Sequence, residues 1–281
     1  MSREPGAFTG SADLPDGRAR QDPQPLWREE IALRNRMLAR SAVSAAEGIL
    51  MERYGLPAPA DGFELLRNCS QKHNIKLHTL ADAVVRVPGP DHGAPRWFPG
   101  RARSGPPGLA GVAPAADADP ATASKGAALG AALTRALEVM ETDMGNVQLA
   151  ESGLLRLDRH RGLDRQFTDY FAFVEDGTTA CAQAATERAQ VLVRDVARAE
   201  VFDETSRRVI LHAGSRACHS VPVLDERGAL LAVISSHHAR PLAGLSRSRH
   251  TALDTGAAAL GRWLSWHRRT LVLDALEELH A

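Results

Sequence analysis

The sequence predicts two domains of different fold class: an N-terminal all-α three-helix module and a C-terminal α+β domain with a central antiparallel sheet flanked by helices. Apolar residues recur at helical spacing over residues 26–87. A stretch dominated by Pro and Gly follows at residues 88–123. Beyond it, helical patterns alternate with short strand-like runs. At 281 residues the chain has room for both domains, since domains commonly span about 100–200 residues.

The N-terminal module should contain three helices. The first is expected over residues 26–54, ending at Gly55, which suits the left-handed position after a helix. The second is expected to run from Pro59, a favourable first-turn residue, to Gln71. Asn74 is expected to cap the third helix. Because two short helices bury little apolar surface alone, they must close onto the end of the first.

Gly48 lies inside the first predicted helix, in the stretch AAEGILMERYG. A glycine in a helix interior costs about 1 kcal/mol relative to alanine. We therefore expect Gly48 to let a neighbouring backbone approach the helix closely. A merely tolerated glycine is the alternative.

Two segments have the composition of unstructured chain. Residues 1–25 are rich in Gly, Pro, Asp and Arg and are expected to form a disordered tail. Residues 88–123 are expected to form an interdomain linker. Trp97 and Phe98 are the only aromatic residues of this linker, and a tethered linker is favoured over a docked one.

The C-terminal domain, residues 124–281, is expected to alternate helix and strand. A strand–turn–strand unit with a turn at residues 225–228 is the clearest signal. The expected elements are a helix at 126–144, strands at 145–152 and 153–160, helices at 166–174 and 179–189, a strand at 190–196, a helix at 203–214, the paired strands of 217–238, and a long helix from about 246 onward.

Charge and cysteine content narrow the class of protein. The formal net charge is zero, so any nucleic-acid surface must be local. Only three of the 34 basic residues are Lys. The three cysteines form no CxxC pair, which favours reduced thiols in the cytoplasm. No signal-peptide pattern and no run of about 18 apolar residues is present. We therefore expect a cytoplasmic protein with no membrane partner.

The segments RSAVSAAEGILMERYG and FELLRNCSQKHNIKLHTLADAVV follow one another in the N-terminal module. Together they resemble the ANTAR domain over about residues 31–87. The resemblance implies a small three-helix RNA-binding module of bacterial transcription antitermination regulators. It further implies that the module binds an RNA hairpin, usually as a homodimer, and so prevents a terminator from forming.

Under this resemblance, Arg, Lys, His and Asn side chains are the candidates for RNA contact, because RNA stems are held through phosphate and 2′-OH groups. Several of them cluster at the expected start of the third helix, whose N-terminus also favours an anion. The candidates are Arg34, Arg40, Arg67, Lys72, His73, Asn74 and Lys76.

Two positions depart from the family pattern. Glu47 stands where the family usually has Lys, and Gly62 stands where it usually has Ala. Gly62 is expected mainly to weaken its helix. Glu47 is expected to weaken RNA binding, because one lost phosphate contact lowers the salt dependence by about one unit. The alternative function is a sensor or protein-interaction protein whose ANTAR module no longer binds RNA.

The succession GNVQL at 145–149, the segment 181–184, the strand at 191–196 and the unit at 217–228 resembles the GAF sensor domain over about residues 125–269. The resemblance implies a sensor of an unknown small-molecule ligand or a protein-interaction domain, often dimeric. A GAF domain usually precedes ANTAR in such regulators. The reversed order here argues against coupling through a shared helix.

The same domain also contains His and Cys residues that could serve a catalytic or metal-binding role. His219 lies beside Cys218, and His237 and His238 occupy the neighbouring strand. Adjacent residues of a strand point to opposite faces, so at most one of this pair can join His219. Cys181 with Cys218 could form a redox pair, although buried inert thiols are favoured. The expectation is no enzyme, no catalytic residue, no metal and no cofactor, with a GAF-type redox or metal enzyme as the third hypothesis.

Overall fold

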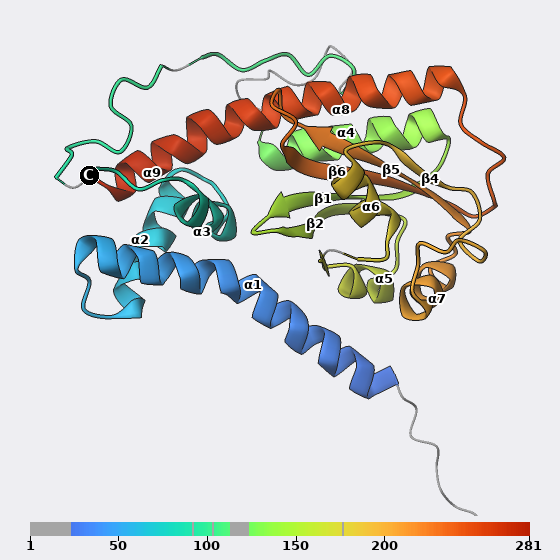
Figure 1. Cartoon of the computed structure of the whole chain (residues 1–281), viewed down its shortest axis with the longest axis horizontal. Coiled ribbons are helices and arrows are strands. Elements are labelled where there is room, and N and C mark those ends of the chain that lie inside the picture. Colours follow the sequence, from blue (N-terminus) through green and yellow to red (C-terminus); the bar gives the residue numbers. More distant parts are fainter. Residues whose placement is uncertain (1–23, 92, 103, 113–123, 176) are drawn as a thin grey trace, which may run out of the picture.

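The computed structural model describes residues 24–91, 93–102, 104–112, 124–175 and 177–281. Nearly all of the expected disordered tail and the second part of the expected linker lie outside the described residues. The N-terminal helical unit consists of α1 (Gln24–Tyr54), α2 (Pro59–Lys72) and α3 (Leu77–Arg86), as predicted (Figure 1). In the described part of the chain, no helix combines the length and the apolar character that a membrane span requires.

The C-terminal unit is an α+β domain built on a six-stranded antiparallel sheet in the order β3-β2-β1-β6-β5-β4, which confirms the predicted class. One expected helix, 166–174, is instead a short helix followed by an edge strand. The elements are α4 (Lys125–Met140), β1 (Met144–Glu151), β2 (Leu154–Arg161), α5 (Arg165–Tyr170), β3 (Phe173–Val174), α6 (Ala180–Glu187), β4 (Val191–Val193), α7 (Glu204–His212), β5 (Ala217–Leu224), β6 (Leu230–His238), α8 (Arg247–His267), the π-helical turn η1 (Arg268–Val272) and α9 (Leu273–Leu279).

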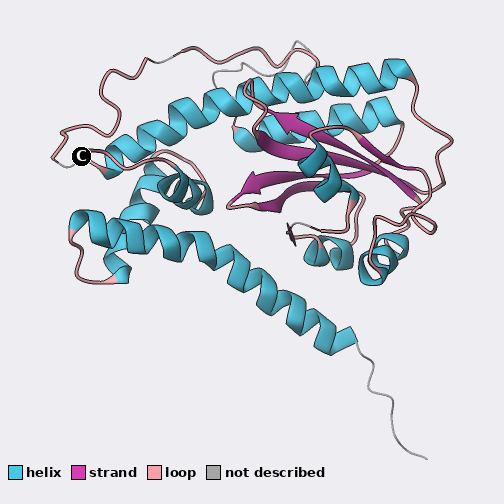
Figure 2. Ribbon diagram, viewed as in Figure 1, coloured by secondary structure: helices cyan, strands magenta, loops and turns pink. Residues whose placement is uncertain are grey.

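Helices cover both faces of this sheet (Figure 2). α4 and α8 pack on one face, and α5, α6 and α7 lie over the other. Gly261 allows α8 to lie close to the sheet, because a Cβ at this position would overlap the carbonyl oxygen of Leu224. The domain therefore encloses an apolar layer on each side of its sheet.

The C-terminal helix does not end with the sheet domain. Beyond η1 it continues as α9 alongside the N-terminal helical unit (Figure 1). Leu276 of α9 is fully buried with Leu50 of α1, Leu66 of α2 and Leu80 of α3. The Cys69 thiol donates a hydrogen bond to the Ala275 carbonyl oxygen at 3.0 Å. The reversed domain order is therefore compatible with a helix that the two units share.

The first part of the expected linker is docked and not merely tethered. Trp97 is 4% exposed and lies in the core of the helical unit. Its indole N–H donates to the Pro88 carbonyl oxygen at 2.8 Å, and the Arg53 guanidinium lies 4.5 Å from the ring centroid. The Phe98 amide donates to Glu277 at 2.9 Å. The apolar indole is buried in the core of the helical unit, a position that composition alone did not reveal. The expectation of a merely tethered linker was therefore wrong.

The glycine expected to permit close helix packing was misassigned. Gly48 is exposed, and a Cβ built there would meet nothing within 4 Å. Gly62 on α2 is the buried position, and its Cβ would lie 3.2 Å from the Glu47 carbonyl oxygen. The departure from the family pattern at position 62 thus coincides with the close approach of α2 to α1.

Asn74 does not cap α3. It takes a left-handed conformation with φ of 50°, just after α2 ends. Lys76 occupies the N-cap position instead and supplies no capping hydrogen bond from its side chain. Asparagine tolerates the left-handed region better than most residues, which explains its place in this turn.

α1 spans both units. Its C-terminal half packs in the helical core, and its N-terminal half lies along α5. Trp27 stacks on Tyr170 with ring centroids 5.8 Å apart. The Asn35 side-chain amide donates to the Asp169 carbonyl oxygen at 2.8 Å. Together, α1 and the α8–α9 helix connect the two units on opposite sides (Figure 1).

Candidate nucleic-acid interface

The basic cluster, defined as Lys72, His73, Asn74 and Lys76, forms the turn that joins α2 to α3. Lys72 is the last residue of α2 and Lys76 precedes α3. The structure therefore brings these predicted candidates together, as the sequence indicated. Lys72, Asn74 and Lys76 are exposed and His73 is partly buried. Side chains of the C-terminal unit contact the cluster.

Glu278 of α9 occupies one side of the basic cluster. Its two carboxylate oxygens lie 2.7 Å from Lys72 Nζ and 2.8 Å from His73 Nε2. The Lys72 hydrogen bond is the largest cause that holds the pKa of Glu278 below its usual range. The C-terminal helix thus places a carboxylate against two of the side chains predicted to contact RNA.

Asp158 of β2 occupies the other side. The Lys76 ammonium lies 2.7 Å from Asp158 Oδ2, and the Asp158 side chain is fully covered. Arg156 holds the same carboxylate at 3.1 Å. Burial opposes ionisation of Asp158, but the hydrogen bond from Lys76 and the surrounding cations outweigh it and lower the pKa of this carboxyl.

The three predicted arginines lie apart from the basic cluster. Arg34 on α1 lies 4.0 Å from Glu175 and donates to the Phe173 carbonyl oxygen at 3.4 Å. Arg40 is exposed further along α1. Arg67 pairs with Glu64 within α2 at 3.2 Å. The structure therefore does not unite the seven candidates into one patch.

Sequence reasoning missed an ionic junction between the two units, centred on Glu151 at the end of β1. The Glu151 carboxylate accepts from Arg156 Nε at 2.7 Å and from the Thr79 hydroxyl at 3.3 Å, and it lies 3.9 Å from Lys125 Nζ. Lys125 also donates to Thr79 at 2.9 Å, which links α4 to α3. Burial, the largest influence, lowers the pKa of Lys125 to about 8.

Asp82 of α3 binds the tip of the β1–β2 hairpin. Its Oδ1 accepts from the Ser152 amide at 2.6 Å and from the Ser152 hydroxyl at 2.7 Å. Arg86, one turn later on α3, donates to the same oxygen at 2.8 Å. Ser152 and Gly153 have φ of 51° and 80°, so the tip is a tight turn. α3 thereby fixes the hairpin that carries Glu151.

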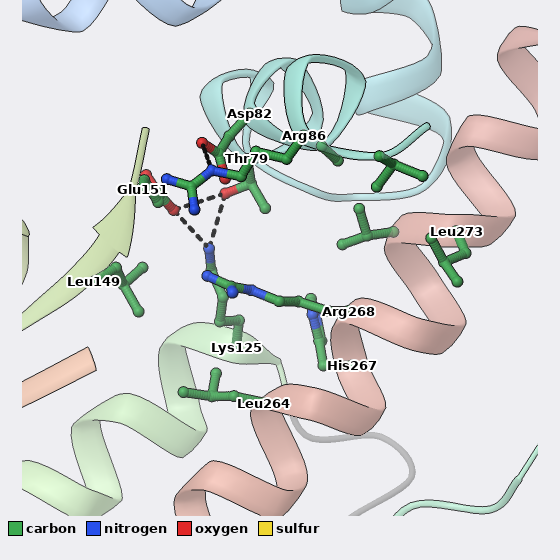
Figure 3. Close-up of a pocket in the computed structure, with 13 residues that line it drawn as sticks. Thr79, Asp82, Arg86, Lys125, Leu149, Glu151, Leu264, His267, Arg268 and Leu273 are labelled. Carbon is green, nitrogen blue, oxygen red and sulfur yellow. Dashed lines mark hydrogen bonds and ion pairs between the residues drawn. The ribbon is translucent and has the colours of Figure 1, made fainter. Parts of the chain in front are cut away.

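A cavity of about 170 Å³ opens between the two units beside this junction. It is bounded by α3, the start of α4, the end of β1 and the turn η1 (Figure 3). Arg268 extends into it from the C-terminal helix and donates to the Ala150 carbonyl oxygen at 3.1 Å. Its lining comprises Thr79, Asp82, Ala83, Arg86, Val87, Lys125, Leu149, Glu151, Leu264, His267, Arg268, Val272 and Leu273.

Two hollows lie on the opposite face of the sheet, and one of them is larger than the junction cavity. The cavity between the sheet and α5–α7 measures about 30 Å³, and the aromatic rings of Phe167, Phe171 and Phe202 line it. Because one water occupies about 10–15 Å³ of such volume, there is room for roughly two waters. The second hollow, of about 480 Å³, lies beside α6 at the β2–β3 edge of the sheet, with Leu155, Ala182 and Ala185 in its lining.

The histidines of the sheet hairpin are separated as the strand geometry requires. His237 shares a face with Cys218 and is held between Ser215 at 3.0 Å and Asn146 at 3.1 Å. His219 pairs with Ser236 on the other face. Burial lowers the pKa of His237 to about 3 and that of His219 to about 4, so both are neutral near pH 7.

The two sheet-domain thiols are also protected. Burial raises the pKa of both Cys181 and Cys218, which keeps them protonated near pH 7. A protonated, buried thiol is a poor nucleophile and a poor metal ligand. Among the described residues, no group of three or more His, Cys, Asp or Glu side chains is placed to hold a metal ion.

Two family models match the chain, one in the N-terminal helical unit and the other in the C-terminal α+β domain. The family model of the ANTAR domain matches residues 32–85. That of the GAF domain matches residues 126–262. α9 lies outside both matches. The chain matches no curated protein.

Solved structures resemble the C-terminal part. The GAF domain of a phosphoenolpyruvate-protein phosphotransferase from Acinetobacter is 15% identical, with 51% of this chain and 83% of that chain covered and a TM-score of 0.43. Free methionine-R-sulfoxide reductase from Neisseria meningitidis is 19% identical, with 51% and 79% covered and a TM-score of 0.41. The phosphotransferase GAF domain from Coxiella burnetii is 13% identical, with 73% and 93% covered and a TM-score of 0.43. The assignment rests on the two family matches.

Proposed function

We propose that this chain, which contains an ANTAR domain and a GAF domain, is a transcription antitermination regulator. The ANTAR domain binds an RNA hairpin, and the GAF domain controls that binding in response to a small molecule. No catalytic step is part of this function. The observation that carries the proposal is the basic cluster, whose Lys72, His73 and Lys76 gather in one turn of the ANTAR domain.

Control follows from what this cluster contacts. Glu278 and Asp158 are presented by α9 and by the GAF domain, and they hold the cations that RNA phosphate would need. RNA binding therefore competes with these internal carboxylates. A signal that moves α9 or β2 relative to the ANTAR domain would release the cluster.

The test is a titration of RNA hairpins enriched from cells, followed by fluorescence anisotropy at several salt concentrations. The double variant Lys72→Glu/Lys76→Glu should lose affinity, and its salt dependence should fall by about 1.4–1.8 units because two phosphate contacts are lost. Arg135→Glu is the matched control, since Arg135 is an exposed cation of α4 paired with Glu138 at 3.2 Å. Equal loss in both variants would mean that the cluster is not the RNA site.

The variant Glu278→Gln tests control. This variant removes the negative charge that faces Lys72 and His73 and keeps the shape of the side chain at position 278. RNA affinity should rise several-fold if the carboxylate competes with phosphate. An unchanged affinity would show that α9 does not restrain the cluster.

A second function is favoured by Glu47. An acid at this position, where the family usually has Lys, repels phosphate, and the cluster's cations already have protein partners. In this alternative the chain is a GAF-based sensor or interaction protein whose ANTAR domain no longer binds RNA. Glu47→Lys separates the two: a gain of RNA binding from an undetectable level favours the alternative.

We also propose that the protein is a homodimer. Leu33 and Met37 lie one turn apart on α1 and are 53% and 66% exposed. Apolar residues at this spacing form a stripe that a second copy of α1 can cover. Light scattering should give twice the mass of one chain, and Met37→Glu should reduce it to one chain.

A further inference from the structure

The junction cavity combines apolar walls with polar side chains that converge on it. Leu149, Leu264 and Leu273 contribute apolar surface from three different elements. Lys125 and Arg268 enter from α4 and from the C-terminal helix (Figure 3). This composition is typical of small-molecule sites, which are mostly apolar with a few placed polar groups.

The carboxylates of the junction are already committed. Glu151 receives its closest contact from Arg156 at 2.7 Å, outside the cavity lining, while Lys125 is 3.9 Å away. Asp82 is bound by Arg86 and by the hairpin tip. Positive charge on the cavity wall therefore exceeds the negative charge left to balance it.

Arg268 is the least compensated cation. Its guanidinium donates to one neutral carbonyl oxygen, and within the described part of the chain it has no salt-bridge partner. Burial is also the main cause that lowers the pKa of Arg268, because it disfavours the charged guanidinium. A buried cation without a paired anion is costly, and a bound carboxylate would relieve that cost.

His267 adds a neutral polar group. Its side chain is 4% exposed, lies on the cavity wall and makes no hydrogen bond to any described residue. Burial lowers the pKa of His267 to about 4, so its ring offers one N–H donor near pH 7. A ligand oxygen could accept that donor.

We propose that the junction cavity is an effector site for a small monocarboxylate with an apolar body. The carboxylate lies between Lys125 and Arg268, and the apolar body packs on Leu149, Leu264 and Leu273. At about 170 Å³ the cavity holds roughly ten waters, which suits a ligand of about ten heavy atoms. The cavity lined by Phe167, Phe171 and Phe202 on the opposite face of the GAF sheet, at about 30 Å³, is too small for such a ligand.

The site's position gives the ligand a route to the ANTAR domain. Arg268 and Val272 begin and end η1, the π-helical turn between α8 and α9. π-helical turns interrupt helix register and are often found at functional sites. A ligand that bridges Arg268 and Lys125 acts directly on the turn from which α9 carries Glu278 to the basic cluster. This regulatory role rests on the proposed function, whereas ligand binding does not.

The experiment is a ligand-observed NMR screen of the full chain with acetate, butyrate, benzoate and phenylacetate, each beside its neutral amide. Calorimetry then measures the strongest probe. At least one carboxylate should bind in the submillimolar to millimolar range, and its amide should bind at least tenfold more weakly. Lys125→Met should weaken carboxylate binding at least tenfold, and Arg135→Met, on the exposed side of α4, should leave it unchanged.

Ala83→Leu provides a second variant that does not remove a charge. Ala83 lines the cavity from α3, so a larger side chain fills it. This variant should stay folded by circular dichroism and lose carboxylate binding. Binding unaffected by both Lys125→Met and Ala83→Leu, or no binding by any probe, would overturn the site. Carboxylate binding without any RNA binding would refute the proposed function and leave the site intact.

Discussion

The two cores of this protein are completed in different ways. The GAF core is closed largely by its own elements, as Leu149 of β1 and Leu260 of α8 illustrate. The ANTAR core contains Leu66 and Leu80 from its own helices. It also contains Leu276 from α9 and Trp97 from the docked first part of the linker. A unit of about 60 residues buries little surface alone. The core of the ANTAR domain therefore depends on segments that lie far away in the sequence.

The largest expected effect comes from a chain that stops after Arg269. Removing Val272, Leu276 and Leu279 opens the ANTAR core, whereas the GAF sheet keeps its layers. Hydrogen exchange should show loss of amide protection in α2 and α3 and retained protection in β1, β5 and β6. Unchanged protection in α2 and α3 would mean that the three helices are stable alone.

Leu276→Ala makes the same comparison with one side chain. It should destabilise the ANTAR domain by about 2–5 kcal/mol, the usual cost of emptying a buried leucine site. Leu260→Ala is its counterpart in the GAF core, with the same full burial. Hydrogen exchange should place the first effect in α2 and α3 and the second in the sheet. Effects spread equally over both units would erase the distinction.

Acid should weaken the GAF domain through its buried histidines. The pKa values of His219 and His237 fall from 6.5 to about 4 and about 3 in the native state. Between pH 6.5 and 4 the unfolded chain therefore binds more protons than the folded chain, so stability falls as the pH falls. Each histidine contributes a slope of up to about 1.4 kcal/mol per pH unit.

His237→Gln checks this assignment. Urea unfolding of the GAF domain measured from pH 7 to pH 4 should lose about one proton's worth of slope relative to the unmodified chain. His212→Gln, at the exposed end of α7, is the matched control and should keep the full slope. An unaltered slope in the first variant would contradict a neutral buried His237.

Asp82→Ala should cost about 1–3 kcal/mol, because it leaves the Ser152 amide at the hairpin tip without its partner. Since Asp82 joins the two units, we expect the effect in their mutual docking, measured by exchange of the β1–β2 hairpin. Glu64→Ala removes an exposed ion pair of α2 and should change stability by less than about 0.5 kcal/mol.

The smallest effects come from two glycines of the ANTAR domain. Gly48→Ala should stabilise it by up to about 1 kcal/mol, because the position is helical and open. Gly62→Ala should give a smaller gain or a loss, because its methyl would press on the Glu47 backbone at 3.2 Å. Thermal unfolding should give a higher melting temperature for Gly48→Ala than for Gly62→Ala. The reverse order would contradict the assigned contact.

The sequence predicted local structure well because local structure depends on residues close together in the chain. The start of α2 and the strands β5 and β6 followed from periodicity and turn residues such as Pro59 and Gly228. Partners were not predictable in the same way. The apolar face of the C-terminal helix was evident, but periodicity cannot say that it changes from the GAF sheet at Leu264 to the ANTAR core at Leu276.

The site showed the same division. Lys72 and Lys76 were predicted as neighbours, but Asp158 and Glu278 come from other parts of the chain and gave no local pattern. One signal was available. All three lysines of this arginine-rich chain, including Lys125, make polar contacts across the boundary between the units.

The participation of α9 in the ANTAR core sets an order of maturation during synthesis. Cys69 and its hydrogen-bond partner Ala275 are 206 residues apart in sequence. At about 5–20 residues per second, a ribosome needs on the order of 10–40 s to add that length. The helices made first therefore wait for the segment made much later, while the GAF domain between them can already fold. A prematurely terminated product would contain the whole RNA-binding sequence and still lack its finished core.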